Sequence, residues 1–352
     1  MELDLISVLW YIILIYVIVQ LVRFIRADAD LTLLWAESFG RKPADQLCGK
    51  VVWITGASSG IGEELAYQLA KTGASLILSA RRENELHRVK QNCIEQSSLQ
   101  EKDILVLPLD LNARGSHEAI TKTAIEHFGK IDILLNNGGR SQRSLCLETG
   151  LDVYQALMEL NYLGTVSLAK CVLPHLVERK RGQIVTISSV AGLAGVPLAS
   201  GYSASKHALQ GFFNSLRSEL VDFPEITISS VCPGPVQSQI TKHAFTGDLG
   251  KAVNSDTDQS HKMSTSRCVS LILVGMANNV KEMWISEQPF LLFNYMWQYT
   301  PTWAWWITDV LGQRRVKNFK AGMVCVQLNS TLQSVLIQEC EKRVFREGGK
   351  VY

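Results

Sequence analysis

The chain has 352 residues, a formal net charge of +2 and 19% charged residues. This near-neutral balance gives no reason to expect a nucleic acid or a strongly acidic partner. The eight cysteines include no C-x-x-C pair and no zinc-ligand spacing, and several lie in apolar runs. We therefore expect buried free thiols and no metal site. The length favours one large domain with appendages over two equal domains.

The N-terminal region contains an uncharged apolar stretch, Leu5 to Val22, which is about long enough to cross a bilayer as a helix. It lacks a basic start and a small-residue cleavage site, so we expect residues 1–28 to be a retained membrane anchor. A buried core helix is a weaker alternative, because the stretch has no polar face. Arg23 and Arg26 follow the stretch and favour a cytosolic catalytic region, although two nearby acids weaken this bias. One glycosylation sequon, at Asn329, would matter only in a lumenal orientation.

After a connector expected at residues 29–49, short apolar runs alternate with helical segments. This alternation predicts an α/β fold, a Rossmann-type doubly wound parallel sheet of six to seven strands, within residues 50–288. The runs expected as buried strands are Val51–Thr55, Leu76–Ala80, Ile104–Leu109, Ile131–Asn136, Ile184–Ile187 and Ile226–Cys232, with Met283–Ser286 as a seventh.

The first expected strand runs into a glycine-rich turn, T-G-A-S-S-G-I-G, and then into a helix from Glu63. Such a turn lets the backbone approach a pyrophosphate at a helix N-terminus. It is not a P-loop, because no G-K-[ST] ends it. We therefore predict a dinucleotide site formed by Thr55, Gly56, Ser58, Ser59, Gly60, Ile61 and Gly62.

The second expected strand ends in Ala80-Arg81-Arg82, without the acid that would bind the ribose hydroxyls of NAD. The two arginines instead suit a 2′-phosphate, which favours NADP(H), although two solvated surface arginines are a common alternative. Asp110 and Leu111 end the third strand and are placed to meet the adenine. A loop-capping role for Asp110 is an open alternative.

A third pattern brings together Ser189, which follows a strand, and Tyr202 and Lys206, which are one helical turn apart. A phenol titrates near ~10, and an adjacent ammonium lowers its pKa toward the general acid–base range. Ser189 would donate a hydrogen bond to the oxygen on which charge develops. Taken alone, Tyr-x-x-x-Lys fits an ordinary amphipathic helix equally well, so the assignment depends on the other motifs.

Joined by Asn136-Asn137-Gly138-Gly139, Asn161 and Pro233-Gly234, these motifs resemble in order and spacing the short-chain dehydrogenase/reductase family, over roughly residues 50–286. The resemblance implies that Tyr202 is the proton donor in reduction and that Lys206 lowers its pKa and holds the nicotinamide ribose. It further implies that Ser189 orients the carbonyl and that Asn161 holds the water of a proton relay. Additional cofactor contacts are implied for Asn137, Gly138, Pro233, Val236 and Ser238.

Two positions depart from the family pattern. The usual N-N-A-G is N-N-G-G here, and Ser59 stands where NADP-preferring relatives often have a basic residue. Recognition of the 2′-phosphate therefore rests on Arg81, with Arg82 as a second candidate.

The substrate region is less informative. The polar stretch Gln239–Ser266 is expected to form a mobile lid over the nicotinamide. Residues 289–352 form an aromatic-rich extension with four of the eight tryptophans, interrupted by Pro301, so we expect no second full span. These aromatics suit the headgroup region of a membrane, and closure of an apolar pocket or of a dimer contact is an equal alternative.

The motifs, the resemblance and the anchor together predict an NADPH-dependent carbonyl reductase or alcohol dehydrogenase of the endoplasmic reticulum membrane. Its expected substrates are apolar retinoid, steroid or xenobiotic carbonyls. One alternative is a reductase of lipid ketones of the sphingoid-base type, and another is a non-catalytic scaffold that keeps the fold. The helix from Tyr202, with small Gly211 among its apolar residues, could pack against a twin in a homodimer.

Overall fold

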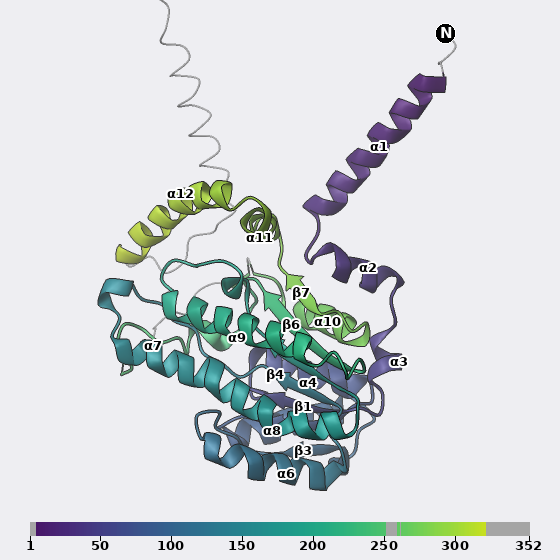
Figure 1. Cartoon of the computed structure of the whole chain (residues 1–352), viewed down its shortest axis with the longest axis vertical. Coiled ribbons are helices and arrows are strands. Elements are labelled where there is room, and N and C mark those ends of the chain that lie inside the picture. The colour runs from purple at the N-terminus through teal and green to yellow at the C-terminus, as the bar shows by residue number, and fades with distance from the viewer. Residues whose placement is uncertain (1–4, 251–258, 261, 322–352) are drawn as a thin grey trace, which may run out of the picture.

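The computed structural model describes residues 5–250, 259–260 and 262–321. Its centre is a parallel seven-stranded sheet of order β3-β2-β1-β4-β5-β6-β7 (Figure 1). The predicted α/β class and all seven predicted strands, including the seventh, are confirmed. The strands are β1 (Val51–Thr55), β2 (Ser75–Ser79), β3 (Ile104–Val106), β4 (Ile133–Asn136), β5 (Gly182–Ile187), β6 (Ile226–Pro233) and β7 (Glu282–Ile285).

The third strand ends earlier than the sequence predicted, at Val106 instead of Leu109. Backbone hydrogen bonds toward β2 continue on both sides of Pro108, from Leu107 to Leu78 (3.0 Å) and from Leu109 to Ala80 (3.1 Å). Alternate N–H groups of a parallel strand face the same neighbour, so the N–H that Pro108 lacks would have pointed away from β2, at the free edge of the sheet, where proline is tolerated. The chain thus stays extended up to Leu109, although the regular strand has ended.

Helices cover both faces of the sheet, and consecutive residues of β1 point to opposite faces. Val52 and Ile54 belong to the apolar core on one face, and Val51 and Trp53 to the core on the other. The first face carries α4 (Gly60–Lys71), α5 (Glu83–Glu95) and α10 (Thr265–Ala277). The second carries α6 (His117–Phe128), α8 (Gly164–Glu178) and α9 (Ser200–Glu219), while α7 (Leu151–Leu157) lies beside α9.

The segment expected only as a connector is folded onto the edge of the sheet as α2 (Leu31–Phe39) and α3 (Pro43–Leu47). Ala29 pairs with Ile285 at the end of β7, and Asp30 caps α2 by accepting N–H groups from its first turn. Arg267 of α10 binds both Asp28 and Glu37. These contacts fix the position at which the N-terminal helix leaves the domain.

The N-terminal helix α1 (Leu5–Ile25) projects away from the domain (Figure 1). Its segment Ser7–Ile25 is, among the described residues, the one helix long and apolar enough to span a membrane. Two further helices, α11 (Phe290–Tyr299) and α12 (Pro301–Lys320), lie at the end of the domain from which α1 emerges. The Phe24 ring of α1 lies 6.2 Å from that of Tyr295 on α11. Pro301 separates α11 from α12, as the sequence indicated; the sequon at Asn329 lies outside the described residues.

The predicted free thiols are confirmed for the described cysteines. All six of these are unpaired. Cys93, Cys232 and Cys268 are buried as predicted, whereas Cys48 and Cys146 are exposed and Cys171 is partly exposed, so the predicted burial is wrong for these three. Burial raises the pKa of Cys93 and of Cys268 to about 12, so these thiols remain protonated. Within the described part of the chain, no cluster of histidine, cysteine and acidic side chains could hold a metal ion.

Candidate active site

The glycine-rich loop is held at the carboxyl edge of the sheet, where β1 and β4 are neighbours and the strand order reverses. The Thr55 hydroxyl accepts the N–H groups of Asn137 (2.9 Å) and Gly138 (3.1 Å). The Asn137 carboxamide donates to the carbonyls of Thr55 (3.1 Å) and Gly56 (3.2 Å). Thr55 and Asn137 therefore act together as a clamp on the loop, a role that their positions in the sequence did not reveal.

Three glycines give this loop its shape. Gly56 and Gly60 have φ values of +66° and +59°, a region that favours glycine. A Cβ on Gly62 would lie 2.2 Å from the carbonyl oxygen of Gly56, so the helix and the loop could not approach each other as they do. The predicted role of these glycines in a tight turn is confirmed by this backbone geometry.

The start of α4 offers hydrogen-bond donors to an anion. Its N-cap residue Ser59 makes no side-chain capping bond, so that side chain leaves the first N–H groups of the helix available. Ile61, in the first turn, is partly buried against the core. A cleft of about 480 Å³ lies between Gly60 and the segment that carries Ser238. The glycine backbone, the helix start and this cleft together fit the pyrophosphate of a dinucleotide.

Cationic side chains from three parts of the chain converge beside this cleft. Arg82 donates to the Ser58 hydroxyl of the glycine loop (3.1 Å), and Arg81 next to it is exposed. Burial and the nearby charge of Arg81 lower the pKa of Arg140. Burial, together with Arg82, Arg140, Arg81 and Lys242, lowers the pKa of His243. Positive charge therefore gathers around Arg140 and Arg81, while the cleft itself is also lined by the carboxylate of Glu63.

Arg140 and His243 were missed from the sequence. The Arg140 side chain donates from Nε to the His243 carbonyl (2.8 Å), and its guanidinium lies 3.8 Å above the Phe245 ring. The signal that could have identified Arg140 is its position directly after the Asn136–Gly139 motif at the end of β4.

In the region expected to contact adenine, Asp110 has the loop-capping role that the sequence left open as an alternative. Its carboxylate accepts the N–H of Asn112 (3.0 Å), so it caps the turn after β3. Leu111 packs against the motif after β4, since a Cβ on Gly138 would lie 2.7 Å from its Cδ1 atom. Contact of Asp110 and Leu111 with adenine stays a prediction.

The structure brings the predicted catalytic residues together at the end of β5 and the start of α9. Lys206 is buried, donates to the Ile187 carbonyl (2.8 Å) and lies 5.8 Å from the Tyr202 ring centre. Ser189 contributes a hydrogen bond that lowers the pKa of Tyr202; its hydroxyl oxygen accepts the N–H of Ala191 (3.1 Å) and lies 3.4 Å from the Pro233 carbonyl oxygen. Serine, tyrosine and lysine thus form one cluster, as their spacing predicted.

The pKa of Tyr202 differs from the expectation in its direction. Burial raises it, and the hydrogen bond with Ser189 and the charge of Arg143 offset only part of this effect. Burial also lowers the pKa of Lys206 to about 8. The sequence indicated that the two groups are close but not how deeply they lie. Lys206 is buried and Tyr202 is partly buried, which disfavours the charged form of each.

Asn161 lies in a π-helical turn, Met158–Leu163, between α7 and α8. Its carboxamide accepts the N–H of Arg140 (2.9 Å) and donates to the Arg140 carbonyl (2.9 Å) and the Ser205 hydroxyl (2.9 Å). The side chain therefore fastens the loop after β4 to α9. A π-turn displaces backbone carbonyls from their usual partners and is frequent at functional sites. The predicted water relay remains a prediction.

The residues after β6 line the same region. Val236 pairs with Met263, and the Ser238 N–H donates to the Gln259 side chain (2.9 Å). A Cβ on Gly60 would lie 3.3 Å from that of Ser238, so this segment rests on the glycine loop. Pro233, at the end of β6, lies beside Ser189 through its carbonyl. The cofactor contacts that the resemblance implies for Pro233, Val236 and Ser238 stay predictions. Part of the expected lid, residues 251–258 and 261, lies outside the described residues.

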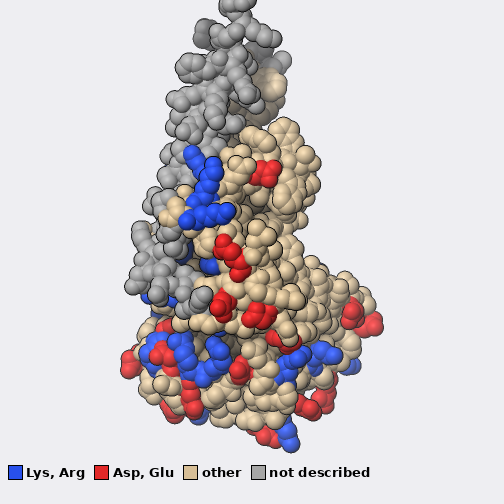
Figure 2. Space-filling model, turned by 90° about the vertical axis from the view of Figure 1, so that its left-hand side faces the viewer, with Lys and Arg blue, Asp and Glu red and all other residues tan. Residues whose placement is uncertain are grey.

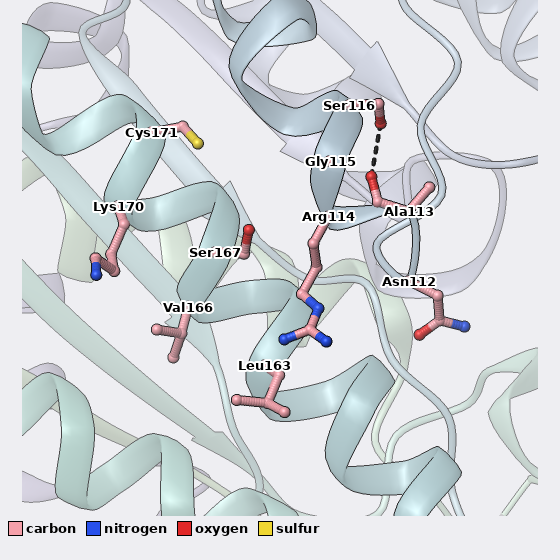
Figure 3. Close-up of a pocket in the computed structure, with 10 residues that line it drawn as sticks. All are labelled: Asn112, Ala113, Arg114, Gly115, Ser116, Leu163, Val166, Ser167, Lys170 and Cys171. Carbon is pink, nitrogen blue, oxygen red and sulfur yellow. Dashed lines mark hydrogen bonds between the residues drawn. The ribbon is translucent and has the colours of Figure 1, made fainter.

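A separate open groove of about 890 Å³ lies between the loop after β3 and the exposed side of α8 (Figure 3). Arg114 extends toward Leu163 in this groove and pairs with Glu159 (3.2 Å). None of the predicted site residues lines this groove.

Gly211 is exposed on α9, where a Cβ would meet open space. Pairing with a second chain through α9 stays a prediction.

Comparison with known proteins identifies the family of this chain. The profile of the family described as short chain dehydrogenase matches residues 50–248, more than half of the chain. Human dehydrogenase/reductase SDR family member 7 is 63% identical, over 90% of this chain and 94% of its own. Its mouse counterpart is 64% identical, over 87% and 91%.

Two solved structures share the fold at low sequence identity. A short-chain dehydrogenase/reductase from Burkholderia phymatum in complex with NAD has a TM-score of 0.61 at 23% identity, covering 70% of this chain and 92% of its own. An alcohol dehydrogenase from Thermococcus sibiricus complexed with 5-hydroxy-NADP has a TM-score of 0.58 at 22% identity, covering 68% and 97%. With the family profile and the two mammalian relatives, the chain belongs to the short-chain dehydrogenase/reductase family of NAD(P)-dependent oxidoreductases.

Proposed function

We propose that this protein is a membrane-anchored, NADP(H)-dependent oxidoreductase that interconverts a carbonyl and an alcohol on apolar substrates. The observation that carries the proposal is the cluster at the end of β5, where Ser189 and the buried Lys206 flank Tyr202. The retinoid and steroid carbonyls expected from the sequence are the first substrates to test. The bound nicotinamide supplies the hydride.

In reduction, Tyr202 donates a proton to the carbonyl oxygen as charge develops on it. The phenol is protonated at neutral pH, but its raised pKa makes it a weaker acid, so the transfer depends on neighbours that stabilise the phenolate. Ser189 donates a hydrogen bond to the same oxygen and orients it. Lys206, with a pKa of about 8, changes charge near physiological pH and stabilises the phenolate left behind.

The preference for NADP(H) is supported by the cations beside the glycine loop. Arg81 and Arg82 follow β2, where an acid would favour NAD, and Arg140 adds positive charge from the loop after β4. Arg82 is already bound to Ser58. Both arginines are exposed, and because Arg82 donates to Ser58 we assign the 2′-phosphate to Arg81. A permanently charged planar guanidinium binds a phosphate in a bidentate manner.

Attachment to a membrane is supported by α1 and by the apolar surface beside its end. Phe24 packs on Tyr295, so α11 lies next to the point where α1 leaves the domain. On α12, Trp303 is 70% exposed, and Trp305 and Trp306 are also exposed. In Figure 2, the upper right of the described surface is mainly uncharged, a group of Lys and Arg side chains lies beside it next to the grey atoms, and the lower part carries charges of both signs. Exposed tryptophans beside a spanning helix are typical of the lipid headgroup region.

This arrangement also links the membrane to the substrate. Gln298 of α11 donates to the Leu193 carbonyl (3.5 Å), and a Cβ on Gly312 of α12 would lie 3.4 Å from Pro197. Both contacts fall on the loop between Ser189 and Tyr202. We therefore place the substrate entrance beside α11 and α12, where a lipid-dissolved carbonyl can reach it. The proposed location is the endoplasmic reticulum membrane, with the catalytic domain in the cytosol as Arg23 and Arg26 favour.

A non-catalytic scaffold is the principal alternative. Burial of the Lys206 ammonium opposes folding, and a scaffold gains nothing in exchange. The test is NADPH oxidation by the full-length protein in lipid nanodiscs with retinal, a 3-ketosteroid, a long-chain keto lipid and a simple quinone. Turnover of at least one apolar carbonyl is expected. No oxidation with any of them, while NADPH still binds, would favour the scaffold.

A further inference from the structure

A buried amide links the loop after β4 to the helix that carries the catalytic tyrosine. Gln142 has no exposed surface. Its Oε1 atom accepts the N–H groups of Gly201 (2.8 Å) and Tyr202 (3.3 Å) in the first turn of α9. The N-cap residue of α9, Ala199, makes no side-chain capping bond. Gln142 therefore supplies from a distant segment the cap that this helix lacks.

The orientation of the Gln142 amide is determined by its partners. Its nitrogen donates to the hydroxyls of Ser144 (3.0 Å) and Thr149 (3.4 Å). With the reverse orientation, the amide nitrogen would face two N–H donors at the start of α9. Each half of the amide thus has the partners that it requires, and the side chain is held in one orientation.

The backbone on both sides of Gln142 is hydrogen-bonded to Phe245, in the segment after Ser238. Phe245 donates its N–H to the Ser141 carbonyl (2.9 Å) and accepts the N–H of Arg143 (2.8 Å), forming a parallel bridge. The Arg140 guanidinium lies on the Phe245 ring. One continuous set of contacts therefore runs from the segment beside the cofactor cleft through Gln142 to Tyr202.

We propose that Gln142 is a positioning residue. By capping the start of α9, it fixes the position of Tyr202 relative to Ser189, and it couples the tyrosine to the segment around Phe245. This inference rests on the proposed function, because it assigns Tyr202 the role of proton donor. A small displacement of a proton donor lowers turnover strongly while binding of the cofactor is kept.

The test uses two variants of the full-length protein. Gln142→Met removes the acceptor and keeps the approximate volume. Gln142→Glu keeps acceptor oxygens, and the Ser144 and Thr149 hydroxyls can rotate to donate to them. Gln183→Met is the matched control, because Gln183 is another buried glutamine, located at the opposite end of β5 from Ser189.

We expect Gln142→Met to lower kcat at least tenfold with the Kd for NADPH unchanged within twofold, and Gln142→Glu to restore kcat to within threefold of the wild type. A double variant with Phe245→Ala should lose less activity than the product of the two single losses. A kcat for Gln142→Met within twofold of the wild type, or equal losses of kcat and NADPH binding, would overturn the proposal.

A titration separates this inference from the proposed reaction. The charged and titratable groups around Tyr202 are Lys206 on its own helix, Arg143 beside Gln142 and Cys232 on β6. The carboxylate of Gln142→Glu adds negative charge at the start of α9, which should raise the pKa of Tyr202. The Tyr202 signal is the phenolate absorbance that is missing in Tyr202→Phe. In Gln142→Glu we expect the midpoint of this signal at a pH at least 0.5 higher than in the wild type. An unchanged midpoint contradicts the coupling. Absence of turnover in the wild type refutes the reaction, and the titration still tests Gln142.

Discussion

The burial of Lys206 makes a quantitative prediction about stability. Its pKa falls from 10.5 to about 8 because burial disfavours the ammonium. This shift corresponds to about 3 kcal/mol, at ~1.4 kcal/mol for each tenfold change in the dissociation constant. The folded pKa lies below the unfolded one, so the full destabilisation is present below pH 8. Between pH 8 and 10.5 the unfolded chain binds more protons, and stability rises with pH.

Lys206→Met removes this dependence. The variant also loses the hydrogen bond to the Ile187 carbonyl, at a penalty of about 1–3 kcal/mol that does not vary with pH. The informative quantity is therefore the difference in unfolding free energy between variant and wild type at pH 7 and at pH 10.5. We expect the variant to lose about 3 kcal/mol relative to the wild type between these two pH values.

The assay is urea unfolding of the cofactor-free, full-length protein in detergent micelles, followed by tryptophan fluorescence and extrapolated linearly. Lys71→Met, at an exposed position in the last turn of α4, controls for the removal of a lysine. If the difference between Lys206→Met and the wild type is the same at both pH values within ~0.5 kcal/mol, an amount small against the expected change, the buried ammonium is not a source of instability.

Two further predictions concern the cofactor and the membrane. Arg81→Asp should weaken NADPH binding by tenfold or more and leave NADH binding nearly unchanged, because a carboxylate would face the 2′-phosphate; an unaltered ratio of the two Kd values would transfer this role to Arg82 or Arg140. Replacement of both Trp303 and Trp306 by serine should reduce the quenching of tryptophan fluorescence by brominated lipids, since each aromatic inserted into lipid contributes on the order of 1 kcal/mol or more to binding. It should also raise the KM for lipid-dissolved retinal severalfold and leave the KM for a water-soluble quinone unchanged. Val221→Ser, at an exposed apolar position after α9, is the control, and equal quenching in all three proteins would argue that the α12 tryptophans do not contact lipid.

Much of the fold could be predicted because its signals are local. Apolar runs such as Val51–Thr55, followed by glycine or serine, are typical of buried parallel strands, and the structure has strands at all seven predicted places. The end of β3 was placed too late because the chain stays extended, and hydrogen-bonded toward β2, up to Leu109, beyond the end of the regular strand. The packing of the connector at residues 29–49 could not be predicted from the sequence. It depends on specific contacts with distant residues such as Arg267, which pairs with Asp28 just before the connector and with Glu37 within it.

In the candidate site, too, local patterns could be predicted from the sequence and long-range contacts could not. Tyr202 and Lys206 are recognisable from their spacing, and the glycine loop from its position after a strand. Arg140 and Gln142 were missed because their partners are 103 and 59 residues away in the sequence. The pKa direction of Tyr202 was also not predictable, since it depends on how completely the surrounding elements exclude water.

The most direct test of the account is the reduction of retinal by Tyr202→Phe in lipid nanodiscs with NADPH. This change keeps the ring and removes only the titrating oxygen, so the Kd for NADPH should stay within twofold of the wild type. We expect the rate of reduction to fall by ~10²–10⁴-fold, the usual contribution of a general acid. A rate within a few-fold of the wild type would show that another group donates the proton and would contradict the account.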